Sequence, residues 1–153
     1  MPRVRKGSGK IKFTGVEYLN QNNEIITPHC GQFLRIKVSF VVDEDGYDGC
    51  ELSLGVRDMY GEPMMTFPTE FTIEPFHLNA GMHYTYCDIN KLPLSEGTYN
   101  LGLWSGIRKE ESDYIDSYIK MTVEADDFFG TGRSVAGYHA GKVVFCDHSW
   151  RIN

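Results

Sequence analysis

Two aromatic side chains, Trp104 and Tyr118, have the chemistry of a ligand platform, because each is predicted to lie on the outer side of a strand. In "TYNLGLWSG", residues 98–106, bulky apolar residues alternate from position 99 to position 103 and define the core side. Trp104 falls out of phase with them and therefore points outward. An outward tryptophan can cover a second buried surface or present a flat ring to a ligand. A flat ring suits a sugar, whose C–H groups form an apolar face.

Hydrogen-bonding side chains share this outward phase on three predicted strands, residues 51–59, 98–106 and 116–125. In an immunoglobulin-like strand order these strands pair side by side, so their outward faces form one surface. Amide, hydroxyl and charged groups can bind the hydroxyl rim of a sugar, and Gly55 and Gly102 would leave a shallow floor. An alternative stays open, in which the aromatic residues cover a crossing loop or a dimer contact. The predicted carbohydrate-binding residues are Trp104, Tyr118, Arg57, Asn100, Lys120 and Ser53.

Known catalytic motifs are missing from the sequence. It contains no G-x-S-x-G, P-loop, dinucleotide-binding or H-E-x-x-H pattern. A glycosidase needs two carboxylates across a cleft, whereas the acidic clusters at residues 43–45, 110–113 and 126–127 lie in predicted turns. Solvated loops explain such clusters best, with calcium binding as a lesser alternative. We therefore predict that the protein is not an enzyme, and a carbohydrate-active enzyme using these acids is the least favoured alternative.

The cysteines and histidines do not form a metal-binding pattern. The four cysteines, at positions 30, 50, 87 and 146, include no C-x-x-C pair, and the five histidines include no pair at helical ligand spacing. The sequence therefore predicts neither a metal site nor a cofactor. Two disulfides are arithmetically possible, but reduced thiols are favoured because a chain of 153 residues can bury a core without cross-links.

The charge balance argues against a nucleic-acid partner. The formal net charge is -6, whereas nucleic-acid binders present a basic face. Basic residues gather only between Arg3 and Lys10, where a solvated lead-in to the first strand is favoured over a contact with anionic lipid or phosphate. No apolar run is long enough to span a bilayer, and the residues after Met1 do not form a signal peptide. These features predict one cytoplasmic domain, residues 1–153.

Alternating apolar residues separated by turn signals predict about eight short strands and no helix. This pattern is typical of an all-β antiparallel sandwich of the immunoglobulin-like or jelly-roll kind. The polar segment 106–116 is predicted to be a long hairpin loop, and residues 126–142 a long irregular segment. The apolar end, residues 142–153, is predicted to complete its own sheet or to add to a partner's sheet. The predicted strands cover residues 10–19, 33–42, 51–59, 64–67, 82–89, 98–106, 116–125 and 142–146.

The order and spacing of several segments resemble the C-terminal domain of Wzt-type proteins, the ATPase subunits of ABC transporters that export O-antigen polysaccharide in Gram-negative bacteria. The segments are "GSGKIKFTGVEYLNQNNE", "CGQFLRIKVSF", "LGVRDMYGEPM", "LPLSEGTYNLGLW" and "FFGTGRSVAGYHAGKVVF". The resemblance covers nearly the whole chain and implies that it is an excised part of a longer protein with a preceding nucleotide-binding domain. None of the segments is a catalytic signature, and no binding residue is carried over from the family.

The resemblance implies a β-sandwich that binds the modified non-reducing end of the polysaccharide in the cytoplasm and so selects finished chains for export. It also implies a homodimer in which the strand at residues 142–153 is exchanged between subunits, and a membrane contact only through the parent transporter. The predicted function is therefore a non-catalytic carbohydrate-binding module that recognises an O-antigen terminus. The alternative function is a structural module that only dimerises a larger cytoplasmic protein.

Overall fold

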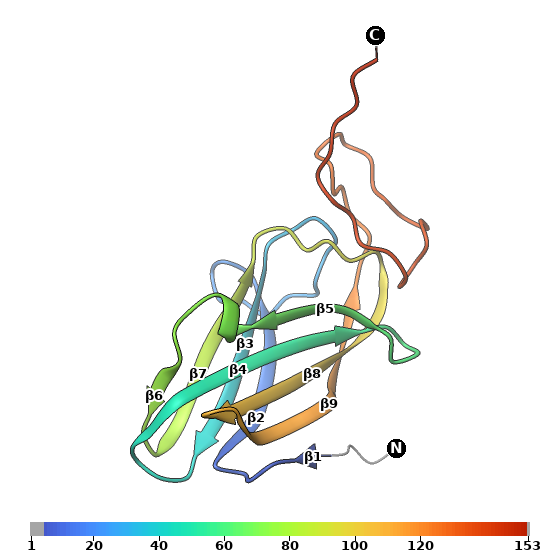
Figure 1. The fold of residues 1–153 in the computed structure, drawn as a ribbon. Helices are drawn as coiled ribbons and strands as arrows, with labels where there is room; N and C mark the ends of the chain where they lie inside the picture. The colour runs from blue at the N-terminus through green and yellow to red at the C-terminus, as the bar shows by residue number, and fades with distance from the viewer. Residues whose placement is uncertain (1–4, 153) are drawn as a thin grey trace.

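The computed structural model describes residues 5–152, which form two antiparallel β-sheets packed face to face (Figure 1). Sheet A has the strand order β1-β9-β8-β4-β5, with β6 also paired to β4, and sheet B has the order β2-β3-β7. The predicted all-β antiparallel sandwich is confirmed. A 3₁₀ turn, η1 (Thr69–Phe71), follows β5. The strands are β1 (Arg5–Lys6), β2 (Ile11–Leu19), β3 (Leu34–Val42), β4 (Tyr47–Arg57), β5 (Pro63–Pro68), β6 (Phe76–Leu78), β7 (Gly81–Ile89), β8 (Gly97–Ile107) and β9 (Glu110–Val123).

The hydrophobic core lies between the two sheets and consists of the side chains that alternate inward along each strand. On β8, Tyr99, Leu101 and Leu103 are at most 1% exposed, as the alternation predicts. Removing apolar side chains from water is the dominant favourable term in folding, so these alternating residues decide which face of each strand points outward. The matching inward residues are Leu34, Ile36, Val38, Phe40 and Val42 on β3, and Leu52, Leu54 and Val56 on β4.

The hairpin between β8 and β9 is tighter than the sequence predicts. β8 ends at Ile107 and β9 begins at Glu110, so only Arg108 and Lys109 separate the strands, with φ angles of 50° and 69°. Two residues with left-handed backbone are typical of a type I′ turn, whose twist matches that of the flanking strands. The predicted long loop over residues 106–116 is wrong, because this polar segment is paired with β8.

A bulge interrupts β9 where it passes Gly102 of β8. Leu101 and Leu103 are two residues apart on β8, but their partners on β9 are four residues apart. The extra residues bend β9 locally. A Cβ on Gly102 would lie 2.7 Å from the Asp116 carbonyl oxygen, so this position on β8 requires glycine.

Arg5 ties the start of the described chain to β9. Its guanidinium donates to the Asp113 carboxylate from Nε at 2.8 Å and from Nη2 at 2.7 Å, and the hydrogen bond to Asp113 raises the pKa of Arg5. The same carboxylate is buried and accepts a hydrogen bond from the Phe13 amide at 2.8 Å. Arg5 and Lys6 are exposed, as the predicted solvated lead-in requires, but they form β1 and Arg5 is paired with Asp113; Arg3 lies outside the described residues.

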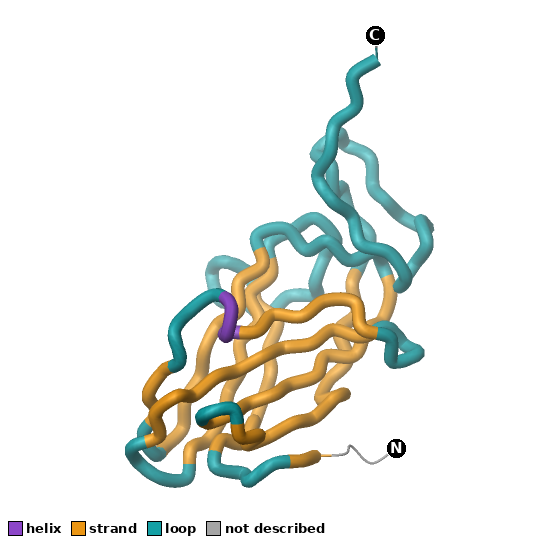
Figure 2. Tube along the Cα trace, viewed as in Figure 1, coloured by secondary structure: helices purple, strands orange, loops and turns teal. Residues whose placement is uncertain are grey.

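The chain after β9 leaves one end of the sandwich as an irregular tail (Figures 1 and 2). Residues 126–152 contain neither strand nor helix, which confirms the irregular segment predicted at residues 126–142. The predicted strand at residues 142–146 is wrong, because these residues form only an isolated antiparallel bridge between Leu94 and Val144. The tail therefore packs against its own chain near Leu94 and then continues outward.

Three further features concern the cysteines, membrane-spanning helices and metal-binding groups. All four cysteines are free thiols in the structure, and burial raises the pKa of Cys30 to about 11. Within residues 5–152, no helix has the length and apolar character that a bilayer crossing requires. The same part of the chain holds no group of three or more His, Cys, Asp or Glu side chains that could bind a metal ion.

Candidate functional site

The three strands predicted to share one surface are neighbours in sheet A, in the order β9-β8-β4. Their outward side chains form cross-strand rows, in which directly opposed residues lie close enough to interact. Five of the six predicted binding residues lie in these rows, which we call the outer surface of sheet A. The first row joins Pro68, Ser53, Trp104 and Tyr114, the second joins Thr66, Gly55 and Gly102, and the third joins Pro63, Arg57, Asn100 and Lys120.

Trp104 is half-buried at the centre of the first row. Its six-membered ring lies over Gly106, where an added Cβ would approach Trp104 Cη2 to 2.2 Å, so the ring needs a glycine beneath it. The indole Nε1 donates a hydrogen bond to Glu111 Oε1 at 3.2 Å. Backbone contact on one side and a hydrogen bond at the edge hold the indole in one orientation, which lowers the entropic cost of stacking a ligand on it.

Trp104 and Ser53 line two adjoining shallow hollows on the outer surface of sheet A. The first hollow has a volume of about 160 Å³, and its floor contains Gly55 and Gly102. The second, about 320 Å³, lies toward the β8–β9 turn. Glycine floors beside an aromatic ring create room for a flat ligand without a deep pocket. The other residues that line the first hollow are Arg57, Thr66, Leu103, Tyr114 and Asp116, and those that line the second are Glu51, Leu52, Pro68, Glu70 and Lys109.

Fixed charges border the second hollow. Lys109 Nζ lies 2.9 Å from Glu70 Oε1 and 3.0 Å from Glu51 Oε1. Hydrogen bonds to Glu70 and then to Glu51 raise the pKa of Lys109, so the ammonium form is favoured. A positive charge held by two carboxylates is positioned to donate to an oxygen-rich ligand.

Polar side chains of the third row contact carbonyl oxygens of the turn between β4 and β5. Arg57 Nη1 donates to the Gly61 carbonyl oxygen at 2.9 Å, and the Asn100 amide makes a long contact of 3.5 Å with the Asp58 carbonyl oxygen. Lys120, opposite Asn100, is exposed. These side chains offer donors and an acceptor at the rim of the surface, which is the complement that sugar hydroxyls need.

The structure does not place Tyr118 with the other predicted residues. Its ring packs against the hydrophobic core, it lies near Arg5, and it does not line either hollow. Tyr118 lies in the stretch of β9 between Ile115 and Ile119 that is bulged opposite Gly102, so it has no directly opposed residue in the cross-strand rows. The aromatic partner of Trp104 is instead Tyr114.

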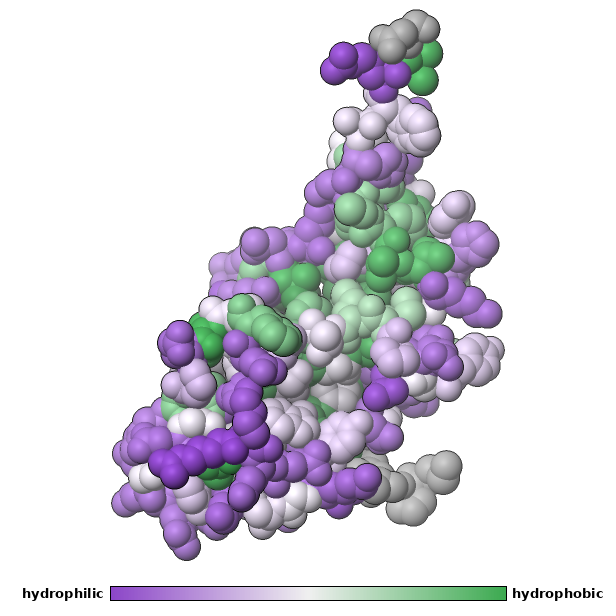
Figure 3. Space-filling model, viewed as in Figure 1, coloured by the Kyte–Doolittle hydropathy of each residue, from purple (hydrophilic) through white to green (hydrophobic). Residues whose placement is uncertain are grey.

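Tyr114 was missed because residues 110–115 have a polar composition that favours a loop. The only sequence signal for its position is indirect: a two-residue turn at Arg108 and Lys109 would bring it opposite Trp104. Figure 3, which views the outer face of sheet A, shows residues of intermediate hydropathy across the middle of this face, with apolar residues gathered toward the base of the tail. The outer surface of sheet A thus has mixed polarity rather than the apolar character of an exposed core.

Comparison with known proteins gives a likeness at the level of fold. No protein-family model and no curated protein matches the sequence. The crystal structure of the C-terminal domain of Wzt superposes on this chain with a TM-score of 0.75, covering 99% of this chain and 89% of that one at 15% sequence identity. A Niemann-Pick type C2 protein from Japanese carpenter ant gives a TM-score of 0.47, covering 81% of this chain and 100% of that one at 10% identity. The predicted resemblance to the Wzt C-terminal domain is therefore confirmed for the fold.

Proposed function

We propose that this protein is a non-catalytic carbohydrate-binding module that recognises the terminus of an O-antigen-type polysaccharide for export by an ABC transporter. The observation that carries the proposal is the Ser53–Trp104–Tyr114 row, with Arg57 and Asn100 along its flank. The shared fold with the C-terminal domain of Wzt supports the same class. In this proposal the whole chain, residues 1–153, acts as one domain at the cytoplasmic face of the inner membrane and meets the membrane only through its parent transporter.

The binding chemistry divides between ring faces and rim groups. The C–H face of a pyranose stacks on Trp104 or Tyr114, because both present flat apolar rings with a polar edge. Sugar hydroxyls then exchange hydrogen bonds with Ser53, Arg57 and Asn100, and Lys120 contacts the next unit. A shallow, solvent-exposed surface of this kind binds in the micromolar to millimolar range, roughly -4 to -8 kcal/mol.

An array of purified bacterial O-polysaccharides tests the proposal, with the affinity of any bound glycan then measured by calorimetry. Replacing Trp104 by alanine is expected to raise Kd by about tenfold, because a stacked ring and its buried area are both lost. Tyr84→Ala is the matched control, since Tyr84 is 61% exposed but lies on β7 of sheet B. If Trp104→Ala and Tyr114→Ala bind the glycan as well as the wild type, the surface is misassigned.

A second candidate role, dimerisation through the tail, is favoured by the exposed apolar residues near the end of the chain. Val144 is 50% exposed, Trp150 83% and Ile152 89%, and the tail extends beyond the sandwich (Figure 1). Apolar side chains in an extended segment are suited to pairing with a second copy, including exchange of residues 142–153 between subunits. Deleting residues 142–153 and measuring the mass in solution tests this role. A dimer should become a monomer while glycan binding by the outer surface of sheet A is retained.

A further inference from the structure

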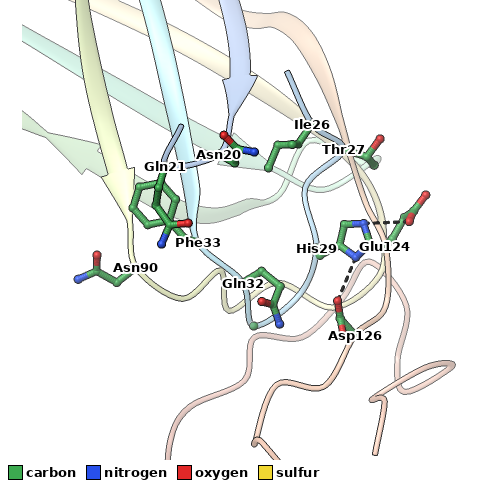
Figure 4. Close-up of a pocket in the computed structure, with 11 residues that line it drawn as sticks. Asn20, Gln21, Ile26, Thr27, His29, Gln32, Phe33, Asn90, Glu124 and Asp126 are labelled. Atoms are coloured by element: carbon green, nitrogen blue, oxygen red, sulfur yellow. Dashed lines mark hydrogen bonds and ion pairs between the residues drawn. The ribbon is translucent and has the colours of Figure 1, made fainter. Parts of the chain in front are cut away.

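A larger pocket lies at the end of the sandwich from which the tail leaves, away from the outer surface of sheet A (Figure 4). We call it the end pocket. Three separate stretches of chain build it: the segment from Asn20 to Phe33, the residue Asn90 after β7, and the segment from Glu124 to Asp126 after β9. Its volume, about 680 Å³, falls within the range of about 300–1,000 Å³ typical of small-molecule sites.

Backbone hydrogen bonds between these segments make the walls of the end pocket firm. The Cys30 amide donates to the Glu124 carbonyl oxygen, and the Glu124 amide donates to the Pro28 carbonyl oxygen, both at 2.9 Å. The Gly31 amide donates to the Leu92 carbonyl oxygen at 2.7 Å. Since the walls are held by main-chain bonds rather than by side chains alone, a ligand would meet a preformed site.

Three of the four amide side chains that line the end pocket make no hydrogen bond to the described part of the chain, whereas the fourth, Asn20, is bonded to Asn22 and Glu24. Within residues 5–152, no hydrogen bond is made by the side chains of Gln21, Gln32 and Asn90, and all three are exposed. Each amide offers two donors and one acceptor oxygen. Groups that both donate and accept match a ligand that carries several hydroxyl groups.

A histidine and two carboxylates form the opposite side of the end pocket. His29 Nδ1 lies 3.1 Å from Asp126 Oδ2, and His29 Nε2 lies 3.1 Å from Glu124 Oε2, as the dashed lines in Figure 4 show. The backbone amide of Asp127 and His29 lower the pKa of Asp126, which favours its charged form. This side of the pocket therefore accepts hydrogen bonds and repels anions.

An apolar wall completes the end pocket. Phe33 and Ile26 are half-buried and line it beside the amides (Figure 4). The Arg35 guanidinium lies 5.6 Å from the centre of the Phe33 ring and is bound to Asp88 by two hydrogen bonds of 2.8 and 3.0 Å. All three guanidinium nitrogens of Arg35 are already bonded, because Nε and Nη2 donate to Asp88 and Nη1 donates to Asn23 Oδ1 at 2.8 Å, so Arg35 lies beside the ring without a nitrogen left free for an anionic ligand.

We propose that the end pocket binds one uncharged pyranose unit, with its C–H face toward Phe33 and its hydroxyls on the amides and carboxylates. The ligand class rests on the proposed function, because the sugar would belong to the same polysaccharide. Neighbouring hydroxyls donate to Glu124 and Asp126, and the remaining ones pair with Gln32 and Asn90. The pocket is thus a second glycan contact, separate from the Trp104 surface and selective against acidic sugars.

Nuclear magnetic resonance of the full chain tests this inference, because the side-chain amides of glutamine and asparagine give signals of their own. The probes are the uncharged methyl glycosides of mannose, galactose, glucose and N-acetylglucosamine, with methyl glucuronoside as the anionic comparison. Uncharged glycosides should shift the amide signals of Gln32 and Asn90. Gln32→Ala and Asn90→Ala should each raise Kd by about three- to tenfold through loss of a hydrogen bond. Asn22 carries an exposed amide outside the pocket, so the control variant Asn22→Ala should change Kd by less than about twofold.

The outcomes separate this inference from the proposed function. An O-polysaccharide that shifts only signals of the outer surface of sheet A overturns the inference and leaves the proposed function standing. Glycosides that shift the Gln32 and Asn90 amides while no O-polysaccharide binds support the end pocket and contradict the proposed function. Unchanged affinity in both pocket variants, or stronger binding of the glucuronoside than of the uncharged glycosides, overturns the inference.

Discussion

Replacing Gly102 by alanine is expected to destabilise the sandwich, whereas the same change at Gly55 is expected to be tolerated. The two glycines face each other across β8 and β4. A Cβ on Gly102 would lie 2.7 Å from the Asp116 carbonyl oxygen and 3.0 Å from that of Ile115, whereas a Cβ on Gly55 would meet nothing within 4 Å. The atoms that oppose Gly102 belong to the backbone of the β9 bulge, so they cannot rotate away. Overpacking of this kind costs roughly 1–3 kcal/mol.

Urea unfolding of the two variants measures this difference. Gly102→Ala should lower the free energy of unfolding by roughly 1–3 kcal/mol with an unchanged m value. In thermal unfolding, each kcal/mol should lower Tm by about 2–4 °C in a chain of this size. Gly55→Ala should stay within about 0.5 kcal/mol of the wild type. Equal stability of Gly102→Ala and Gly55→Ala would refute the inference that the bulge of β9 requires a glycine on β8.

Three further predictions follow from the packing and charges. Asp113→Ala should lower the free energy of unfolding by roughly 2–4 kcal/mol, because the buried carboxylate accepts hydrogen bonds from Arg5 and from the Phe13 amide. A loss below about 1 kcal/mol in urea unfolding would contradict this prediction. Cys146 is the one exposed cysteine of the four, so it should react first with a thiol reagent, and Cys146→Ser should remove the fast phase. The hydrogen bond to Asp48 raises the pKa of His77 above 6.5. In the Asp48→Asn variant, a chemical-shift titration should therefore give a lower pKa for His77 than in the wild type. The stabilisation by this pair is complete between pH 3.8 and pH 6.5, is lost as the pH rises through the raised pKa of His77, and is lost again as the pH falls through the lowered pKa of Asp48.

Regular alternation explains how much of the fold could be predicted from sequence. The core residues of β3 repeat without a break from Leu34 to Val42, and those of β8 repeat from Tyr99 to Leu103, so both strands and their buried faces were predicted correctly. The neighbours β4, β8 and β9 were predicted from an immunoglobulin-like order, and the structure pairs them. As a result, Ser53 and Arg57 were correctly placed on the surface that carries Trp104.

Tertiary contacts explain what the sequence could not predict. The first half of β9 is polar, but Ser112 is buried there, and its hydroxyl is satisfied by a hydrogen bond that it accepts from the Ile11 amide at 3.0 Å. The two residues of this contact are 101 positions apart in the sequence, so the local composition around Ser112 does not predict it. The bulge that leaves Tyr118 without an opposed residue on β8 is a property of the pairing between β8 and β9 rather than of either strand. The end pocket is likewise assembled from loops without periodicity, so only the folded chain brings His29 to Glu124.

The indole signals of the two tryptophans provide the most direct test of the proposed carbohydrate-binding surface. Trp104 lies in the Ser53–Trp104–Tyr114 row, whereas Trp150 is 83% exposed in the tail and serves as an internal control. During titration with an O-polysaccharide selected on the array, the Trp104 Nε1–H signal should shift in proportion to the bound fraction while the Trp150 signal stays in place. A glycan that binds with the Trp104 signal unmoved would contradict the assignment of this surface.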